Sequence, residues 1–286
     1  MIRFLILAGY FELTMYLQLS GKLNQYINLH YSYLAYISMF LSFVLALVQL
    51  IIWVKQMKIH SHLSGFWAKV ASIFLLCIPL FVGLFFPTVT LDSQTVSAKG
   101  YHFPVAAGSS KEIQQDEGTT TQYLKPDTSS YFTKSAYESE MKQAAKKYVD
   151  KKVIQVTTEN YMEVMEVIYD YPDQFAGKTI ELTGFVYNDP NNKDSQFLFR
   201  FGIIHCIADS GVYGLLTTGA PQHFENNTWI HAKGTLSIEY HKQLKQSLPV
   251  LHISDCQTIT KPANPYVYRV FWWSYQVSSV VDPNSL

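Results

Sequence analysis

A long stretch without a charged side chain, from Ser32 to Val54, constrains this chain more than any other feature of its sequence. As an α-helix rising about 1.5 Å per residue, it is long enough to cross the roughly 30 Å hydrocarbon core of a bilayer. Val70 to Phe86 is a second uncharged run, and Phe4 to Leu19 is a third that carries one acid, Glu12. We therefore predict three transmembrane helices within residues 1–89.

The loops between these runs predict how the helices are oriented. Lys55, Lys58 and Lys69 flank the second turn, whereas the first loop carries only Lys22. Because basic loops stay in the cytoplasm, we expect a cytoplasmic N-terminus and an extracytoplasmic segment 90–286 in a multi-pass membrane protein. The first run also fits a signal peptide, but Leu17 to Ser20 offers no small-residue cleavage site, which favours an uncleaved anchor.

The composition and the pattern of apolar residues divide residues 90–286 into four segments. Residues 90–134 contain few large apolar side chains and predict an extracytoplasmic tether. Residues 135–175 predict a helical lead-in, with helices over 135–149 and 159–170 and a short strand at 153–156. We place a β domain at 176–262 and a C-terminal tail at 263–286.

Four acids of the second predicted helix form one stripe: Glu159, Glu163, Glu166 and Asp170. Their spacing of three and four residues places them on one helix face, which predicts a solvated face opposite a buried one. A surface that attracts cations is the alternative.

From residue 178 onward the sequence predicts β-strands. Alternation predicts strands over 178–187, 229–238 and 248–259, and the Phe- and Ile-rich stretch 197–216 predicts two strands joined by a tight polar turn at 208–211. Gly184 and Gly234 predict bends. The fold class that we predict is therefore an α-helical transmembrane region followed by an extracytoplasmic α+β domain with a five-stranded OB-like β-barrel. An SH3-like barrel is the alternative.

Several segments carry a family resemblance: FGIIHCIADSGVYGLL, WIHAKGTL, LPVLHISD and KPANPYVYR, which follow apolar spans ending in FFPTVTLDSQTV. Together they resemble the YcgQ-type family of bacterial membrane proteins, from the first span to about Arg269. The resemblance implies a protein of the bacterial plasma membrane that works beside a separate multi-span permease. The second turn, often long and His-rich in that family, is short here, and residues 270–286 lie beyond the resemblance.

Two small groups of side chains are candidates for binding substrate or a divalent metal. His205 and Cys206 are neighbours in a predicted strand, so they point to opposite faces and do not form a catalytic dyad. We expect Cys206 to be a packed interior thiol, with a metal ligand or redox thiol as alternatives, while Asp209 beside His205 can contribute a carboxylate ligand. His60 and His62 provide half a metal site, or else belong to a polar turn between spans.

Glu12 is the one acid within the predicted spans. A carboxylate in hydrocarbon is costly unless it is paired, and the other spans offer no donor at its depth, so we predict that Glu12 contacts a helix of a partner subunit. A glutamate that reaches the interface is the alternative.

Charge and motifs narrow the function. The 22 basic residues balance 22 acidic ones, and the predicted strands carry no dense basic stripe, which argues against nucleic-acid binding. The sequence has no phosphate-binding glycine loop, HExxH helix or GxSxG elbow, so an enzyme is the less favoured class. We predict an accessory permease subunit whose external domain binds, delivers or gates substrate. The alternatives are a membrane-anchored thiol- or metal-dependent enzyme and a surface interaction module.

Overall fold

The computed structural model describes residues 1–57, 65–86, 89–101, 134–190, 196–241 and 246–268, and only the backbone for 134–138. His60 and His62 lie outside the described residues, as do most of the predicted tether and the tail beyond residue 268. The chain divides into two compact units, Met1–Thr90 and Leu91–Leu286, which are described separately.

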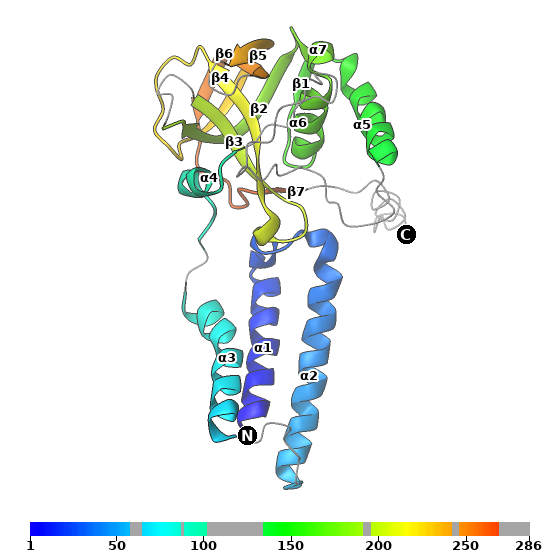
Figure 1. Ribbon diagram of the computed structural model, residues 1–286, viewed down its shortest axis with the longest axis vertical. Coiled ribbons are helices and arrows are strands. Elements are labelled where there is room, and N and C mark those ends of the chain that lie inside the picture. The colour runs from blue at the N-terminus through cyan, green and yellow to red at the C-terminus, as the bar shows by residue number, and fades with distance from the viewer. Residues whose placement is uncertain (58–64, 87–88, 102–133, 191–195, 242–245, 269–286) are drawn as a thin grey trace, which may run out of the picture. The chain divides into compact units, whose positions relative to one another are not determined.

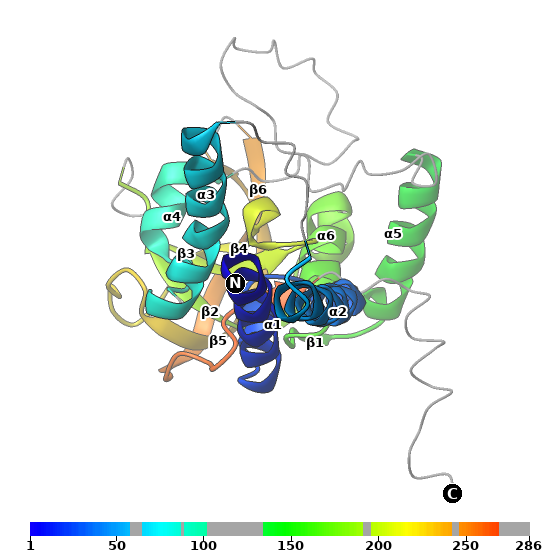
Figure 2. The ribbon, with the colours of Figure 1, turned by 90° about the horizontal axis from the view of Figure 1, so that it is seen from below.

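The first unit is helical, as Figure 1 and Figure 2 show. Its long helices are α1 (Ile2–Leu19), α2 (Ser32–Val54) and α3 (Phe66–Phe85), and the 3-10 turns η1 (Lys22–Gln25) and η2 (Leu29–Tyr31) connect α1 to α2. All three long helices have the length and the apolar composition to cross a membrane. The described residues thus confirm three candidate membrane helices.

Helix α1 packs along both α2 and α3, whereas α2 and α3 scarcely touch. Glycine allows α1 and α3 to approach closely, because a Cβ at Gly83 would lie 2.8 Å from Cδ2 of Leu13. The Tyr10 hydroxyl also donates a hydrogen bond of 2.9 Å to the carbonyl of Leu76. Both contacts pair residues at matching depths on α1 and α3.

The second unit combines helices with a sheet. Its helices are α4 (Ser93–Lys99), α5 (Lys134–Val149), α6 (Tyr161–Asp170) and α7 (Pro172–Phe175), with a 3-10 turn η3 (Ile207–Asp209). Its strands are β1 (Val153–Gln155), β2 (Thr179–Asn188), β3 (Gln196–Ile203), β4 (Gly211–Thr218), β5 (Trp229–His241), β6 (Gln246–Thr258) and β7 (Val267–Tyr268). Each strand predicted from the sequence is present, with ends shifted by a few residues.

The sheet has the strand order β1-β2-β5-β6-β4-β3-β7, and an additional β2–β3 pairing connects distant strands of that order. The resulting ring is uneven, since β5 and β6 pair along most of their length whereas β4 meets β6 only from Leu216 to Thr218. A β-bulge falls between Lys233 and Gly234, where the sequence predicts a bend. The structure therefore establishes a strand-rich domain with a strongly curved sheet.

Two apolar clusters cover the two faces of this sheet. One contains side chains of α5 and α6 together with buried strand residues such as Leu182, Leu236 and Leu251. The other, here called the aromatic face, is formed by Phe185, Tyr187, Phe197, Phe199, Phe201 and Trp229. Alternation of side chains along the strands separates these clusters.

Residues 91–101, here called the strap, cover the aromatic face. Val96 of α4 is fully buried there, and the Tyr101 ring lies 4.9 Å from the Phe197 ring between centroids. The Tyr101 hydroxyl donates to the Asp189 carboxylate at 2.9 Å, and burial raises the pKa of Tyr101. This end of the predicted tether is thus folded against the domain, with a helix that the sequence analysis does not predict.

The acid stripe of α6 differs from its prediction. Glu166 is only 3% exposed, and Glu163 accepts hydrogen bonds from the Tyr148 hydroxyl at 2.7 Å and from Lys147 at 2.9 Å. The prediction of one solvated stripe is wrong at Glu166, because α5 packs against α6 and removes part of that face from water.

Arg200 connects β3 to the end of the described chain. Its buried guanidinium donates hydrogen bonds to the carbonyls of Asn264, Pro265 and Tyr266, each at 3.1 to 3.2 Å, and to the Thr158 hydroxyl at 3.0 Å. Burial lowers the pKa of Arg200. Residues 264–266 are therefore an integral part of the domain.

Candidate functional site

The turn between β3 and β4 brings together the predicted site residues His205, Cys206 and Asp209. Strand β3 ends at Ile203, so the prediction that His205 and Cys206 are strand residues on opposite faces is wrong. The cause is Asp209, whose Oδ1 accepts backbone N–H groups of His205 at 3.2 Å and Cys206 at 3.0 Å. These bonds replace strand pairing by a capped 3-10 turn.

The same carboxylate orients the imidazole. Nδ1 of His205 lies 2.7 Å from Oδ2 of Asp209, an ion-pair distance between two side chains that are each about one-third exposed. A proton on Nδ1 leaves the lone pair on Nε2, which is the arrangement that carboxylates impose on metal-binding and proton-accepting histidines. Since both Asp209 oxygens already accept hydrogen bonds within the turn, Asp209 is suited to orienting His205 rather than to binding a ligand itself.

Cys206 is half-buried, not part of a packed interior. The backbone N–H of Asp209 donates to the carbonyl oxygen of Cys206 at 3.1 Å, which closes the turn through the backbone. Ala208, two residues further along the turn, is exposed. The thiol is therefore a free, half-buried side chain in the turn rather than a core residue.

The strap fixes the far end of this turn. Nζ of Lys99 donates hydrogen bonds to the buried Ser210, at 3.2 Å to its carbonyl and 3.1 Å to its hydroxyl. Ile207 packs against the cluster that contains the aromatic face. The turn is consequently held by both the sheet and the strap.

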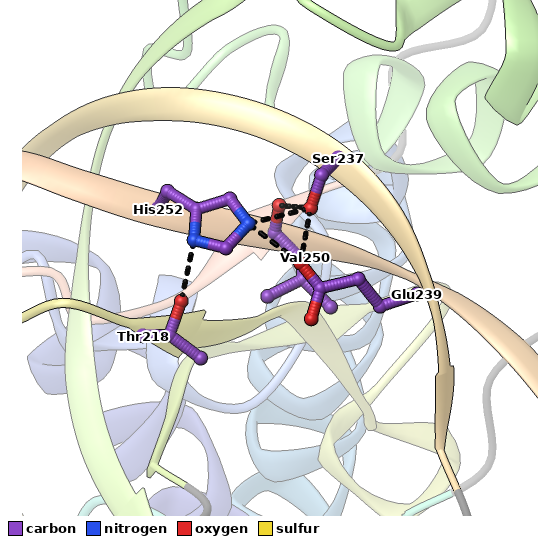
Figure 3. Close-up of polar contacts among 5 residues, drawn as sticks. All are labelled: Thr218, Ser237, Glu239, Val250 and His252. Atoms are coloured by element: carbon purple, nitrogen blue, oxygen red, sulfur yellow. Dashed lines mark hydrogen bonds and ion pairs between the residues drawn. The ribbon is translucent and has the colours of Figure 1, made fainter.

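A second polar group, which sequence reasoning missed, lies on the outside of β4, β5 and β6 (Figure 3). His252 places Nδ1 2.8 Å from the Thr218 hydroxyl and Nε2 2.7 Å from the Ser237 hydroxyl. Nε2 also lies 2.6 Å from Oε1 of Glu239, which accepts the Ser237 hydroxyl at 2.7 Å. Outward positions on three strands could be recognised from alternation, but their meeting depends on a register that the sequence does not reveal.

The chemistry of this group is that of a paired imidazole rather than a nucleophilic triad. The Ser237 hydroxyl donates its hydrogen bond to the carboxylate of Glu239 and not to the imidazole of His252. In addition, Nδ1 of His252 faces the Thr218 hydroxyl, whereas in a catalytic triad this nitrogen faces a carboxylate. The Ser237 hydrogen bond, followed by that of His252, lowers the pKa of Glu239 below its ordinary value of 4.5.

A similar arrangement recurs on β2 and β5. The Thr183 hydroxyl lies 2.9 Å from Nδ1 of His231, and Nε2 of His231 lies 3.1 Å from Oε1 of Glu181. Each imidazole thus has a threonine on one side and a glutamate on the other. Within the described ranges, no three His, Cys, Asp or Glu side chains are close enough together to hold a metal ion.

Glu12 lies on an exposed side of α1. Among the described residues, no side chain forms a hydrogen bond or ion pair with it. The membrane unit itself therefore supplies Glu12 with no described partner.

Comparison with known proteins identifies the family. The DUF1980 N-terminal domain matches residues 2–102, and the DUF1980 C-terminal domain matches residues 131–269. A Streptococcus mutans protein described as a candidate subunit of a two-component membrane permease complex is 68% identical over 271 residues, covering 95% of this chain and 100% of the relative. UPF0703 protein YcgQ of Bacillus subtilis is 40% identical over 291 residues, covering 95% of this chain and 100% of the relative.

Among solved structures, asparaginyl-tRNA synthetase from Pyrococcus horikoshii matches 32% of this chain and 23% of its own, at 14% identity and a TM-score of 0.20, a level that supports no conclusion about fold. The family matches span nearly the whole chain, in agreement with the resemblance in its sequence motifs. The chain belongs to the YcgQ-type DUF1980 family.

Proposed function

We propose that this protein is the accessory subunit of a two-component membrane permease complex, in which its three helices dock against a separate multi-span subunit. The observation that carries the proposal is the 68% identity, over the full length of the relative, to a protein described as a candidate subunit of such a complex. Three helices of spanning length are consistent with that role.

The second unit is, in this proposal, an extracytoplasmic OB-like barrel that receives, delivers or gates the substrate. Support for the barrel comes from the β2–β3 pairing, which connects the ends of a five-strand order β2-β5-β6-β4-β3. Support for the orientation comes from the basic residues near the second turn, among them Lys55 and Lys69.

Within that domain we propose the β3–β4 turn as the place that binds the substrate, a divalent metal ion. Support comes from the His205–Asp209 pair, because a proton held on Nδ1 by the carboxylate leaves Nε2 with the lone pair that binds a metal ion. Because the turn holds only one oriented nitrogen, further ligands would come from the partner subunit or from water.

Co-purification tests the proposed assembly. The tagged full chain, extracted from its native membrane in mild detergent, should retain one multi-span membrane protein in constant ratio, with any bound metal measured in the same sample. Recovery of the chain alone, or only with copies of itself, would contradict the proposal.

Glu12 gives that experiment a graded variant. Glu12→Gln keeps a hydrogen-bonding side chain while Glu12→Leu removes it, so partner recovery should fall from wild type to Gln to Leu, because a donor on the partner helix would lose its acceptor. Met15→Leu, on an exposed apolar position of the same helix, is the matched control and should recover the partner fully. Equal recovery with Glu12→Leu would show that Glu12 is not an assembly contact.

A further inference from the structure

The three membrane helices line an open cleft of about 910 Å³ near the start of α1. Its walls come from the first turns of α1, the end of α2 and the beginning of α3. The cleft exists because α1 packs along both neighbours while α2 and α3 scarcely touch each other. An open cleft of this kind within hydrocarbon is filled by something other than water, because its walls are largely apolar.

Most of the cleft is lined by aliphatic side chains. Ile6 and Leu7 of α1, Ile52 of α2, and Ile73 and Leu76 of α3 contribute to its walls. The lining part of α1 extends from Met1 to Tyr10, a length of about 13 Å at 1.5 Å per residue. This surface matches the upper part of an acyl chain in length and in apolar character.

Two cations line the same end of this cleft. The contacts between α1 and α3 pair Tyr10 with Leu76, Gly9 with Leu80 and Leu13 with Gly83, offsets of 66 to 71 residues, so Arg3 lies level with the part of α3 that begins at Lys69. Both Arg3 and Lys69 line the cleft, and no acidic residue is among its lining residues. No described residue forms an ion pair with either cation.

We infer that this cleft is a binding site for an anionic phospholipid, with the phosphate between Arg3 and Lys69 and an acyl chain along α1. A guanidinium and an ammonium at one end of an apolar groove complement a headgroup phosphate at the end of its acyl chains. Gln56 lines the same end and can donate hydrogen bonds to the headgroup. The site is independent of the permease proposal, since it lies within this chain.

Lipid titration of the purified full chain tests the site. Phosphatidylglycerol should raise the thermal stability of the chain in neutral detergent at lower concentrations than phosphatidylcholine does. Arg3→Gln and Lys69→Gln should each weaken the preference for phosphatidylglycerol about fivefold, and the double variant roughly thirtyfold. Lys55→Gln is the matched control, because Lys55 follows α2 at the same end of the unit but does not line the cleft, and it should change the preference less than twofold.

Two further measurements show whether the bound anion is a phospholipid or free phosphate. Leu7→Trp fills the apolar wall and should abolish stabilisation by both lipids, whereas Arg3→Gln should spare phosphatidylcholine. Inorganic phosphate at millimolar concentration should neither stabilise the chain nor displace the lipid. Three results would overturn the inference: an effect of Lys55→Gln equal to that of Lys69→Gln, displacement by inorganic phosphate, or a natively purified complex in which a protein helix occupies the cleft and no lipid is retained.

Discussion

At the scale of single residues, Asp209 determines what the β3–β4 turn can do. The sequence identifies His205, Cys206 and Asp209 as neighbours, and their proximity in the structure follows directly from that. Their roles could not be predicted, because they depend on where β3 ends. The aspartate accepts backbone N–H groups that strand pairing would otherwise use, and this competition is decided locally by geometry rather than by strand propensity.

His205 is the residue whose replacement tests the proposed site. In zinc and manganese titrations of the purified chain or complex, His205→Ala should abolish turn-dependent binding without lowering the melting temperature by more than about 2 °C, because the side chain is one-third exposed. Asp209→Asn should weaken binding by about 10- to 100-fold, since an orienting carboxylate is lost. His223→Ala, an exposed histidine in the next turn, is the control. Unchanged metal binding in His205→Ala would rule out the turn as a metal site.

The hydrogen-bonded group around His252 could not be predicted from the alternation of polar and apolar residues. Thr218, Ser237 and His252 belong to three strands, and only the register Thr218 opposite His252 and Thr235 opposite His252 brings them together. A polar alternation predicts that each side chain faces outward. It does not predict which outward side chains become neighbours.

At the scale of elements, hydrophobic periodicity predicts the long helices and the strands well, because each is fixed by local pattern. The strap is the principal element that this reasoning missed. Helix α4 has seven residues, and its one deeply buried apolar side chain, Val96, carries too little signal for a periodicity argument. What stabilises it is a tertiary contact with the aromatic face.

The register of β5 is testable through its buried side chains. Leu236 is 1% exposed and lies opposite Leu251, so Leu236→Ala should lower the free energy of unfolding by about 2–5 kcal/mol. Thr235→Ala, the exposed neighbour, should change it by less than about 0.5 kcal/mol. Thermal or denaturant unfolding of the full chain in detergent provides the measurement. A Leu236→Ala variant as stable as Thr235→Ala would show that this register is incorrect.

At the scale of the whole molecule, the proposed function requires a particular orientation in the membrane. In a background without Cys77, Cys206 and Cys256, a cysteine at Gly65 should be shielded from an impermeant thiol reagent in intact cells, because the basic turn is expected in the cytoplasm. A cysteine at the exposed Gln174 should be labelled. Permeabilised cells, in which both positions should react, are the control, and the reverse pattern in intact cells would invert the orientation.

The buried Arg200 has a consequence for how the protein is made. Its carbonyl partners at Asn264 and Tyr266 follow it by 64 and 66 residues, a delay of roughly 3 to 13 seconds at usual rates of synthesis. Until they emerge, burying the guanidinium would leave its N–H donors unsatisfied, so we expect closure of the domain to be disfavoured. A nascent chain cut short before Asn264 would retain nearly all of its strands and still present an open core to proteases. The contacts of Arg200 with residues 264–266 thus couple the closing of the core to the synthesis of the last segment of the domain.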